Sequence, residues 1–584
     1  MKSLSYLNKY LIKYKWRLLA GVLFIVASNL FAVEMPKVVK NAVDEFIGSV
    51  KPDETLSSII MLSLKIAGFY MLLSLGKGFF LFLTRQTIII VSRYIEFDLK
   101  NEVYAQYQRL NYAFYKKNNT GDLMNRISED VSQVRQYLGP GLMYTINLVF
   151  LFTMCVWAMM QISVSLTLIV LAPLPVMSFM IYKVSSRMNQ LSTNVQQEQS
   201  RMSTIVQETF SGIRVIKAYL RERELSNKFS DSAESYKQKN MKLVMVNALF
   251  MPTIVFLIGL SNLLAIYYGG LLTYSNEITP GSIVAFVYFV NMLTWPFASV
   301  GWVTSIVQRA AASQERINEF LRIQPSIVNH SQEPLQHVRE ITFDNVSYKH
   351  ENSGILAIKD LSFSVKAGET LGIVGRTGSG KSTVLNLIMR QVDPVSGEIS
   401  VNGQNLTTIN LDEYRRSSGV VPQEVFLFSD SIRNNIKFGV NEREVQEEEL
   451  IEVTKKAHVY HNIQKFKDGF DTILGERGVN LSGGQKQRVS IARAMLRNPD
   501  LLLLDDCLSA VDTETEEFIL KSIASGSENK ITVIVSHRIS SLRYADRILV
   551  LENGSKAEEG THEELISKEG IYSDMYFKQL AETN

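Results

Sequence analysis

The sequence has few cysteines and nearly balanced charge, and each fact excludes a class of protein. Only two cysteines, Cys155 and Cys507, occur among 584 residues. Two distant thiols provide neither a disulfide framework nor the spacing of a metal site. The formal net charge of +3 is too small to indicate nucleic acid as a partner. The chain therefore resembles neither a disulfide-rich secreted protein nor a nucleic-acid-binding one.

The apolar stretches of the first half lack a ladder of acidic residues, so no proton relay through them is indicated. What they have is length, because each is close to the roughly 20 residues that cross a bilayer as a helix. We expect six spans, near residues 17–37, 59–84, 137–160, 163–183, 243–270 and 281–304. A lipid bilayer is therefore the first expected partner.

Lysine and arginine are concentrated in the N-terminal segment and in the connections 94–136, 184–242 and 305–325. The positive-inside rule places these parts, and with them both termini, in the cytoplasm. Apolar residues recur at helical spacing along the two long connections. We expect each connection to extend two membrane helices beyond the bilayer, joined by short crosswise segments near Leu110–Gly121 and Phe210–Tyr219.

The first 17 residues are basic, with no acidic side chain among them. Tyrosine and leucine recur at helical spacing there, which favours a short amphipathic helix on the membrane surface. A signal peptide is the alternative interpretation. It is disfavoured because the apolar run 18–33 exceeds a typical h-region and no small-x-small cleavage site follows.

A glycine-rich loop in the second half of the chain follows an apolar run and precedes a helical pattern. Strand, glycine-rich loop and helix together form a phosphate cradle, in which backbone N–H groups and the helix N-terminus face the phosphates. The lysine adds a positive charge and the serine that follows offers a hydroxyl to Mg²⁺. We therefore expect a nucleoside triphosphate and Mg²⁺ at Gly375, Arg376, Thr377, Gly378, Ser379, Gly380, Lys381, Ser382 and Thr383.

Residues 501–506 form an apolar run that ends in Asp505 and Asp506. A buried strand that delivers an aspartate to Mg²⁺ is what a P-loop ATPase needs. Gln423, after another apolar run, offers an amide to the metal and the attacking water. His537 follows a third run and can approach the γ-phosphate. Each of these last two is a weak signal alone, and their order strengthens them.

The segment Ser482, Gly483, Gly484 and Gln485 places a hydroxyl and two glycines at an expected helix start, which is a second anion site. A nucleotide held by the first loop does not need this second site within the same subunit. We therefore expect the segment to cover the γ-phosphate of ATP on a partner domain, so that ATP joins two such domains and hydrolysis releases them.

These motifs together resemble the ATPase domain of ATP-binding cassette (ABC) transporters. In that family the motifs are called Walker A (375–382), Q-loop (Gln423), signature (481–485), Walker B (501–505), D-loop (509–512) and switch histidine (His537). Residues 475–478 resemble a segment that distinguishes exporters. Six spans ahead of one such domain resemble an exporter half-transporter of the multidrug and lipid-export type. In that family the two crosswise segments are coupling helices.

Two positions depart from the family. The residue after the Walker B aspartate is usually glutamate, which polarises the attacking water, and here it is Asp506. Asp at this position resembles the slow site of heterodimeric exporters. The family also places an aromatic residue, usually tyrosine, where this chain has His350. Imidazole stacks on adenine with less area, and Tyr348, two residues earlier, is expected to compensate in part.

The resulting hypothesis is an all-α transmembrane domain of six long helices (1–325), a linker (326–338) and an α/β P-loop ATPase domain (339–584). Its function is ATP-driven export of a small amphipathic or hydrophobic drug, lipid or peptide, by a dimer with a second half-transporter. A heterodimer is favoured over a homodimer. The alternatives are an ATP-gated channel, a regulatory membrane ATPase and an importer subunit. A bacterial cytoplasmic membrane is the expected location.

Overall fold

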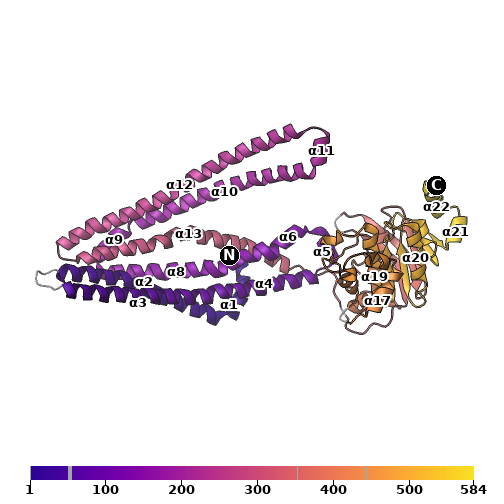
Figure 1. The fold of residues 1–584 in the computed structure, drawn as a ribbon, viewed down its shortest axis with the longest axis horizontal. Coiled ribbons are helices and arrows are strands. Elements are labelled where there is room, and N and C mark those ends of the chain that lie inside the picture. The colour runs from indigo at the N-terminus through magenta and orange to yellow at the C-terminus, as the bar shows by residue number, and fades with distance from the viewer. Residues whose placement is uncertain (1, 50–55, 330, 351–352, 441–442, 584) are drawn as a thin grey trace. The chain divides into compact units, whose positions relative to one another are not determined.

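The computed structural model describes residues 2–49, 56–329, 331–350, 353–440 and 443–583. These residues form two compact units (Figure 1). The first consists of Met1–Gln108 and Thr120–Ile323, and the second of Arg109–Asn119 and Gln324–Asn584. The short segment Arg109–Asn119, which the sequence places in a crosswise turn between two membrane helices, thus belongs with the second unit.

The described residues of the first unit are mostly helical, and six helical stretches among them are long and apolar enough to cross a membrane. This confirms the expected six spans. The longest stretch, Glu222–Tyr274, has 53 residues and is therefore about 80 Å long at 1.5 Å per residue. That is more than twice the hydrocarbon thickness of about 30 Å, so the helix continues well beyond the bilayer. The stretches are Lys15–Ile47, Ile59–Arg109, Thr120–Ile162, Val164–Ser211, Glu222–Tyr274 and Pro280–Leu321.

Local sequence explains where two of these helices begin. Ser163 caps one helix, because its hydroxyl accepts a hydrogen bond from the Leu166 N–H at 3.3 Å, and Pro173 occupies the first turn of the next. The elements in chain order are η1 (Lys2–Leu7), α1 (Asn8–Lys13), α2 (Lys15–Ser49), α3 (Leu56–Thr84), η2 (Arg85–Ile89), α4 (Ile90–Arg109), α6 (Thr120–Asn125), η3 (Arg126–Asp130), α7 (Val131–Gln136), η4 (Tyr137–Gly141), α8 (Leu142–Ile162), α9 (Val164–Leu171), α10 (Pro173–Ser211), α11 (Ile213–Ala218), α12 (Glu222–Tyr274) and α13 (Pro280–Leu321).

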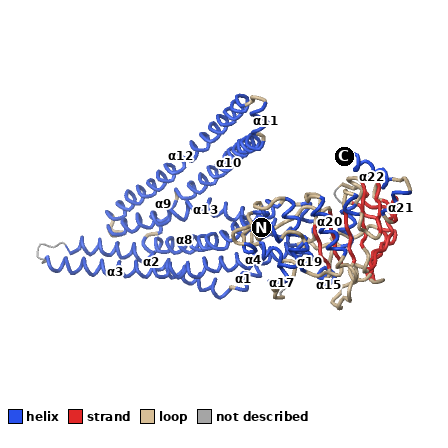
Figure 2. The backbone as a smooth tube through the Cα atoms, turned by 45° about the vertical axis from the view of Figure 1, so that its right-hand side comes forward, coloured by secondary structure: helices blue, strands red, loops and turns tan. Residues whose placement is uncertain are grey.

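The helices α10 and α12 run side by side and are joined at their tip by α11 (Figures 1 and 2). A buried carboxylate of α10 links it to two side chains of α12. Glu198 of α10 accepts hydrogen bonds from the Ser232 hydroxyl at 3.0 Å and from the Lys239 ammonium at 2.6 Å, both on α12. Phe210 and Tyr219 at the tip are more than two-thirds exposed (72% and 75%). The predicted crosswise segment is therefore present, with apolar side chains on its surface.

The second unit is built on two sheets, a four-stranded one in the order β2-β1-β4-β5 and a six-stranded one in the order β10-β9-β3-β8-β7-β6. The strands β9, β3, β8, β7 and β6 are parallel to one another, as an α/β ATPase fold requires, and β10 is antiparallel to β9 at the edge of the sheet. The strands are β1 (Glu340–Lys349), β2 (Leu356–Lys366), β3 (Thr370–Gly375), β4 (Ser396–Val401), β5 (Gln404–Asn405), β6 (Ser418–Val421), β7 (Leu501–Asp505), β8 (Ile531–Val535), β9 (Arg547–Glu552) and β10 (Ser555–Gly560).

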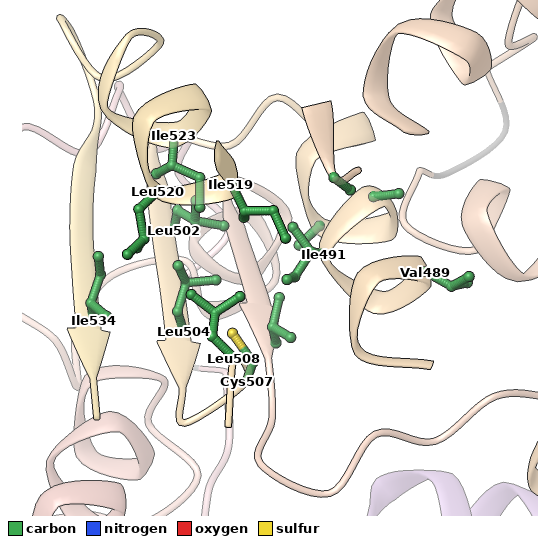
Figure 3. Close-up of a cluster of buried hydrophobic side chains, with 14 of the residues drawn as sticks. Val489, Ile491, Leu502, Leu504, Cys507, Leu508, Ile519, Leu520, Ile523 and Ile534 are labelled. Atoms are coloured by element: carbon green, nitrogen blue, oxygen red, sulfur yellow. The ribbon is translucent and has the colours of Figure 1, made fainter. Parts of the chain in front are cut away.

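Helices cover the six-stranded sheet because its central strands are apolar on both faces. Every residue of β3 and β8 is buried. Figure 3 shows side chains of β7 and β8 together with those of α19 and α20, with Cys507 at the lower edge of the group. The helices of this unit are α5 (Tyr112–Lys117), α14 (Lys381–Ile388), α15 (Leu411–Arg416), α16 (Ile432–Lys437), α17 (Glu447–Lys456), α18 (Tyr460–Ile463), η5 (Gly469–Asp471), η6 (Glu476–Gly478), α19 (Gly483–Leu496), α20 (Thr513–Ala524), η7 (Ile539–Leu542), α21 (His562–Ser567) and α22 (Ile571–Thr583).

Candidate nucleotide site

The glycine-rich loop connects β3 to α14, as the sequence predicts. Gly378 and Gly380 have φ angles of +84° and +100°, which side-chain-bearing residues rarely adopt. A Cβ atom on Gly375 would lie 2.3 Å from the Leu551 carbonyl oxygen, and one on Gly380 would lie 2.5 Å from the Ala357 oxygen. Glycine is therefore required at 375 and 380 by close backbone approach, and this packing holds the loop in the form of a cradle.

Lys381 begins α14 and its side chain turns back to the loop. Its ammonium donates hydrogen bonds to the Gly375 and Arg376 carbonyl oxygens, at 2.7 and 3.1 Å. Burial lowers the pKa of Lys381, while the nearby carboxylates of Asp506 and Asp505 act in the opposite direction. A largely buried cation at the foot of a glycine loop is the group that a polyphosphate needs.

Two further hydroxyls, those of Ser379 and Ser382, fit a polyphosphate and its magnesium ion. The Ser379 Oγ is buried and has no hydrogen-bond partner among the described residues. The Ser382 hydroxyl donates to Asp505 Oδ1 at 3.1 Å. Burial raises the pKa of Asp505, and neighbouring Asp506 adds to that effect, whereas the Ser382 hydrogen bond opposes it. Hydroxyl and carboxylate oxygens are the hard ligands that Mg²⁺ prefers, so this pair fits a magnesium ion.

Asp506 and His537 meet because β7 and β8 are adjacent parallel strands, with Asp505 opposite Val535. The His537 Nε2 lies 2.7 Å from Asp506 Oδ2. Asp506 is only 5% exposed and its Oδ1 has no hydrogen-bond partner in the described chain. Its backbone has a φ of +46°, and its N–H donates to the Val535 oxygen at 2.8 Å. The short carboxylate is thus held against the histidine.

Gln423 follows β6, the strand beside β7, in which Val421 lies opposite Leu504. It therefore comes from the same carboxyl edge of the sheet as Asp505. Its side chain is exposed and forms no hydrogen bond within the described residues. The structure thus brings Lys381, Ser382, Asp505, Asp506 and His537 together by direct contact or close approach, and places Gln423 at their edge without joining it to them.

The segment Ser482–Gln485 begins α19 as a capping box. The Ser482 hydroxyl accepts from the Gln485 N–H at 3.3 Å, and the Gln485 side chain accepts from the Ser482 N–H at 3.0 Å. A Cβ on Gly484 would lie 2.8 Å from the Ala510 oxygen, so this helix start packs closely on the 509–512 loop. Each of these two side chains thus accepts from the other residue's backbone N–H, and among the described residues neither forms a hydrogen bond to the phosphate loop.

His350 lies at the end of β1 and its ring meets Tyr348 edge-on, with centroids 5.2 Å apart. Burial, together with the charge of Lys116 on α5, lowers the pKa of His350, which favours the neutral imidazole. The sequence predicts that Tyr348 partly replaces the missing tyrosine in adenine stacking. Tyr348 is 9% exposed and belongs to the hydrophobic core between the sheets, so little of its ring is accessible, and its part in stacking stays a prediction.

Sequence reasoning missed Arg538, the residue after His537. Its guanidinium donates to the Ser509 oxygen at 2.9 Å and to the Val511 oxygen at 3.4 Å. It therefore ties the histidine loop to the 509–512 loop. Both acceptors are backbone carbonyls, which every residue has. The only signal in the sequence is therefore the arginine next to the histidine.

Comparisons with known proteins identify the family of this chain. The ABC transporter transmembrane region family matches residues 18–297, and the ABC transporter family matches residues 358–509. The chain is 34% identical to YheI of Bacillus subtilis, a probable multidrug resistance ABC transporter ATP-binding/permease protein, over 97% of this chain and 96% of the relative. It is 35% identical to the multidrug resistance-like ATP-binding protein MdlA of Escherichia coli, over 99% and 97%.

A further relative is the ATP-dependent lipid A-core flippase of Syntrophus aciditrophicus, 32% identical over 83% of this chain and 80% of that protein. The structure of a bacterial Atm1-family ABC exporter with ATP bound shares the fold, with a TM-score of 0.80, 24% identity and coverage of 97% and 98%. The chain belongs to the ABC transporters and has the arrangement of an exporter half-transporter. It is a multi-pass membrane protein whose ATPase domain couples ATP hydrolysis to export.

Proposed function

We propose that this chain is one half of a dimeric exporter that moves a small amphipathic or hydrophobic compound out of a bacterial cytoplasm, with both termini on the cytoplasmic side. The observation that carries the dimer is the signature segment. Ser482 and Gln485 present an anion-binding helix start, yet neither bonds to the phosphate loop of its own unit. A second ATPase unit would supply the phosphates that this helix start can bind.

ATP and Mg²⁺ fit the residues of the first loop. Lys381 and the loop N–H groups would hold the β- and γ-phosphates, and the Ser379 hydroxyl would find there the partner that it lacks among the described residues. Ser382 and Asp505 would hold Mg²⁺, with Gln423 as a further oxygen ligand from the edge of the sheet. The bound nucleotide supplies the phosphoanhydride bond, and the chain's own residues orient it and the water. His350 would stack on the adenine.

We infer that Asp506 makes this site a slow one. Its carboxylate is one methylene shorter than glutamate, and His537 holds one of its oxygens at 2.7 Å. A carboxylate that is about 1 Å from its effective place can cost a hundredfold in rate. In a heterodimer the partner would then contribute the faster site, which is why a heterodimer is favoured over a homodimer.

The export function is tested with inside-out vesicles that contain the full chain. ATP-dependent uptake of a fluorescent amphipathic dye is expected, and Lys381→Ala is expected to abolish both uptake and ATP hydrolysis. The matched control is Lys359→Ala, which removes an exposed lysine of the same unit that forms no ion pair among the described residues. Hydrolysis without any vectorial uptake across a panel of dyes, lipids and peptides would contradict the exporter and favour a channel or a regulatory ATPase.

The partner is tested by expressing the chain alone. A well-folded chain that stays monomeric, or a dimer with negligible turnover, supports an obligate second half-transporter. A dimer of this chain that hydrolyses ATP and transports unaided contradicts the heterodimer.

A further inference from the structure

A hollow of about 410 Å³ lies where α1 and the start of α2 run along α4, and it is lined by Lys13, Tyr14, Trp16, Arg17 and Tyr94. Figure 2 shows α1 beside α4 in the helical unit. The hollow is far from the nucleotide site in sequence and shares no residue with it. It lies just before the apolar run of α2, at the level where a membrane helix meets the headgroups.

Aromatic rings fix the arginine at this hollow. The Arg17 guanidinium lies 5.2 Å from the centroid of the Tyr94 ring. Tyr94 in turn stacks on Tyr14, with centroids 6.0 Å apart and an interplanar angle of 18°. The Tyr14 hydroxyl donates to Asp98 Oδ2 at 3.0 Å. Stacking orients a guanidinium and leaves its edge donors free, which suits bidentate binding of a phosphate.

The charges around the hollow are not balanced. Lys13 pairs with Asp98 at 2.6 Å, and Lys9 pairs with Glu102 at 2.7 Å. Lys15 and Arg17 are exposed, and neither forms an ion pair within the described part of the chain. Two of the four basic side chains from Lys9 to Arg17 therefore have no anionic partner among the residues that the structure describes, although Asp98 remains at the edge of the hollow.

Trp16 places the hollow at the membrane interface. Its side chain is 75% exposed, and exposed Leu19 and Leu23 follow on the same helix. Tryptophan favours the headgroup level, where its ring is in an apolar layer and its N–H can reach polar groups. Basic residues at that level attract anionic lipids. Aromatic, apolar and cationic groups thus meet at one place on the surface of the helical unit.

We propose that this hollow binds the phosphate of an anionic lipid headgroup. Arg17 donates two hydrogen bonds to the phosphate, Lys15 adds a second positive charge, and the Trp16 ring packs against the glycerol and upper acyl chain. The site ties the N-terminal segment, and through Tyr94 the helix α4, to the bilayer. It does not depend on the proposed cargo or on the rate of the Asp506 site.

The test reconstitutes the full chain in vesicles of phosphatidylcholine with increasing phosphatidylglycerol. In one series the phosphatidylcholine is brominated and in the other the phosphatidylglycerol. The quenching of Trp16 emission is the difference between the parent chain and Trp16→Phe in the same vesicles. We expect brominated phosphatidylglycerol to quench preferentially. Arg17→Gln should weaken that preference about fivefold, and the double variant Lys15→Gln/Arg17→Gln about 25-fold, from roughly 1 kcal/mol for each basic residue near an anionic surface.

The matched control is Arg85→Gln, since Arg85 is also an exposed arginine next to a span and forms no ion pair within the described chain. It should leave the preference unchanged. Arg17→Lys keeps the positive charge but loses the planar pair of donors, so its preference should lie between those of the parent and of Arg17→Gln. Equal quenching by the two lipids, or equal losses in Arg17→Gln and Arg85→Gln, would overturn the proposal. Loss of the preference for phosphatidylglycerol in about 10 mM inorganic phosphate would also overturn the proposal, because it would indicate a site for free anions and not for a lipid.

Discussion

Replacing Asp506 by glutamate should speed ATP hydrolysis, because the longer side chain moves the carboxylate about 1.5 Å further from the backbone. A misplacement of about 1 Å can cost a hundredfold in rate, or roughly 2.7 kcal/mol of barrier. The gain is opposed by packing, since Asp506 is 5% exposed and an extra methylene in a filled site costs about 1–3 kcal/mol. Part of that cost falls on stability and not on rate. We therefore expect an increase of about ten- to a hundredfold.

The assay is steady-state ATP turnover of the full chain in lipid, at saturating nucleotide and Mg²⁺. Asp506→Asn keeps the length of the side chain and removes its charge, so it separates the two properties. Turnover should follow the order glutamate, aspartate, asparagine. If Asp506→Glu folds, binds ATP as tightly as the parent and hydrolyses it no faster, the length of this carboxylate does not limit the reaction and the slow-site interpretation is refuted.

Three further predictions concern the same unit. Gly380→Ala should lower the free energy of unfolding by about 1–2 kcal/mol more than Gly378→Ala. Both glycines have a positive φ, but only at 380 would the new Cβ lie 2.5 Å from a carbonyl oxygen. Equal changes in thermal unfolding would contradict this. His350→Tyr should tighten ATP binding up to about tenfold, measured by calorimetry, and an unchanged affinity would show that this position does not stack on adenine. Burial raises the pKa of Asp505, so protonation favours the folded metal-free state, whereas Mg²⁺ needs the carboxylate. Mg²⁺-dependent ATP binding should weaken as the pH falls through that raised pKa, and Asp505→Asn should remove this dependence.

The sequence was sufficient for the six spans and for the phosphate loop, because both depend on local properties. Span length follows from the bilayer thickness, and the glycine loop carries its own signals in the strand before it and the helix after it. The extension of α12 beyond the bilayer is predicted by the apolar residues that recur at helical spacing in its charged half. No long-range information is needed for these elements.

Contacts between distant segments could not be predicted in the same way. The pairing of Asp506 with His537 depends on the order of β7 and β8 in the sheet, which the chain order alone does not state. The alternation of buried residues along β1 breaks between Phe343 and Val346, where the pairing with β2 shifts register, so the inward position of Tyr348 does not follow from the first residues of the strand. The contact between Arg538 and the Ser509 carbonyl is invisible because any residue has a carbonyl.

A slow site is compatible with an active exporter, and this has a testable consequence. A ligand shifts a conformational equilibrium only by its different affinity for the two states, so ATP bound at this site can favour closure whether or not it is hydrolysed. Asp506→Asn should therefore keep the rise in melting temperature that Mg²⁺-ATP produces, which corresponds to about 2.7 kcal/mol at 100 times Kd, while losing turnover. Lys381→Ala should lose both, because the ammonium contacts the phosphate loop itself. If Asp506→Asn also loses the ATP-dependent stabilisation, Asp506 holds the nucleotide and its contribution cannot be assigned to the hydrolytic step alone.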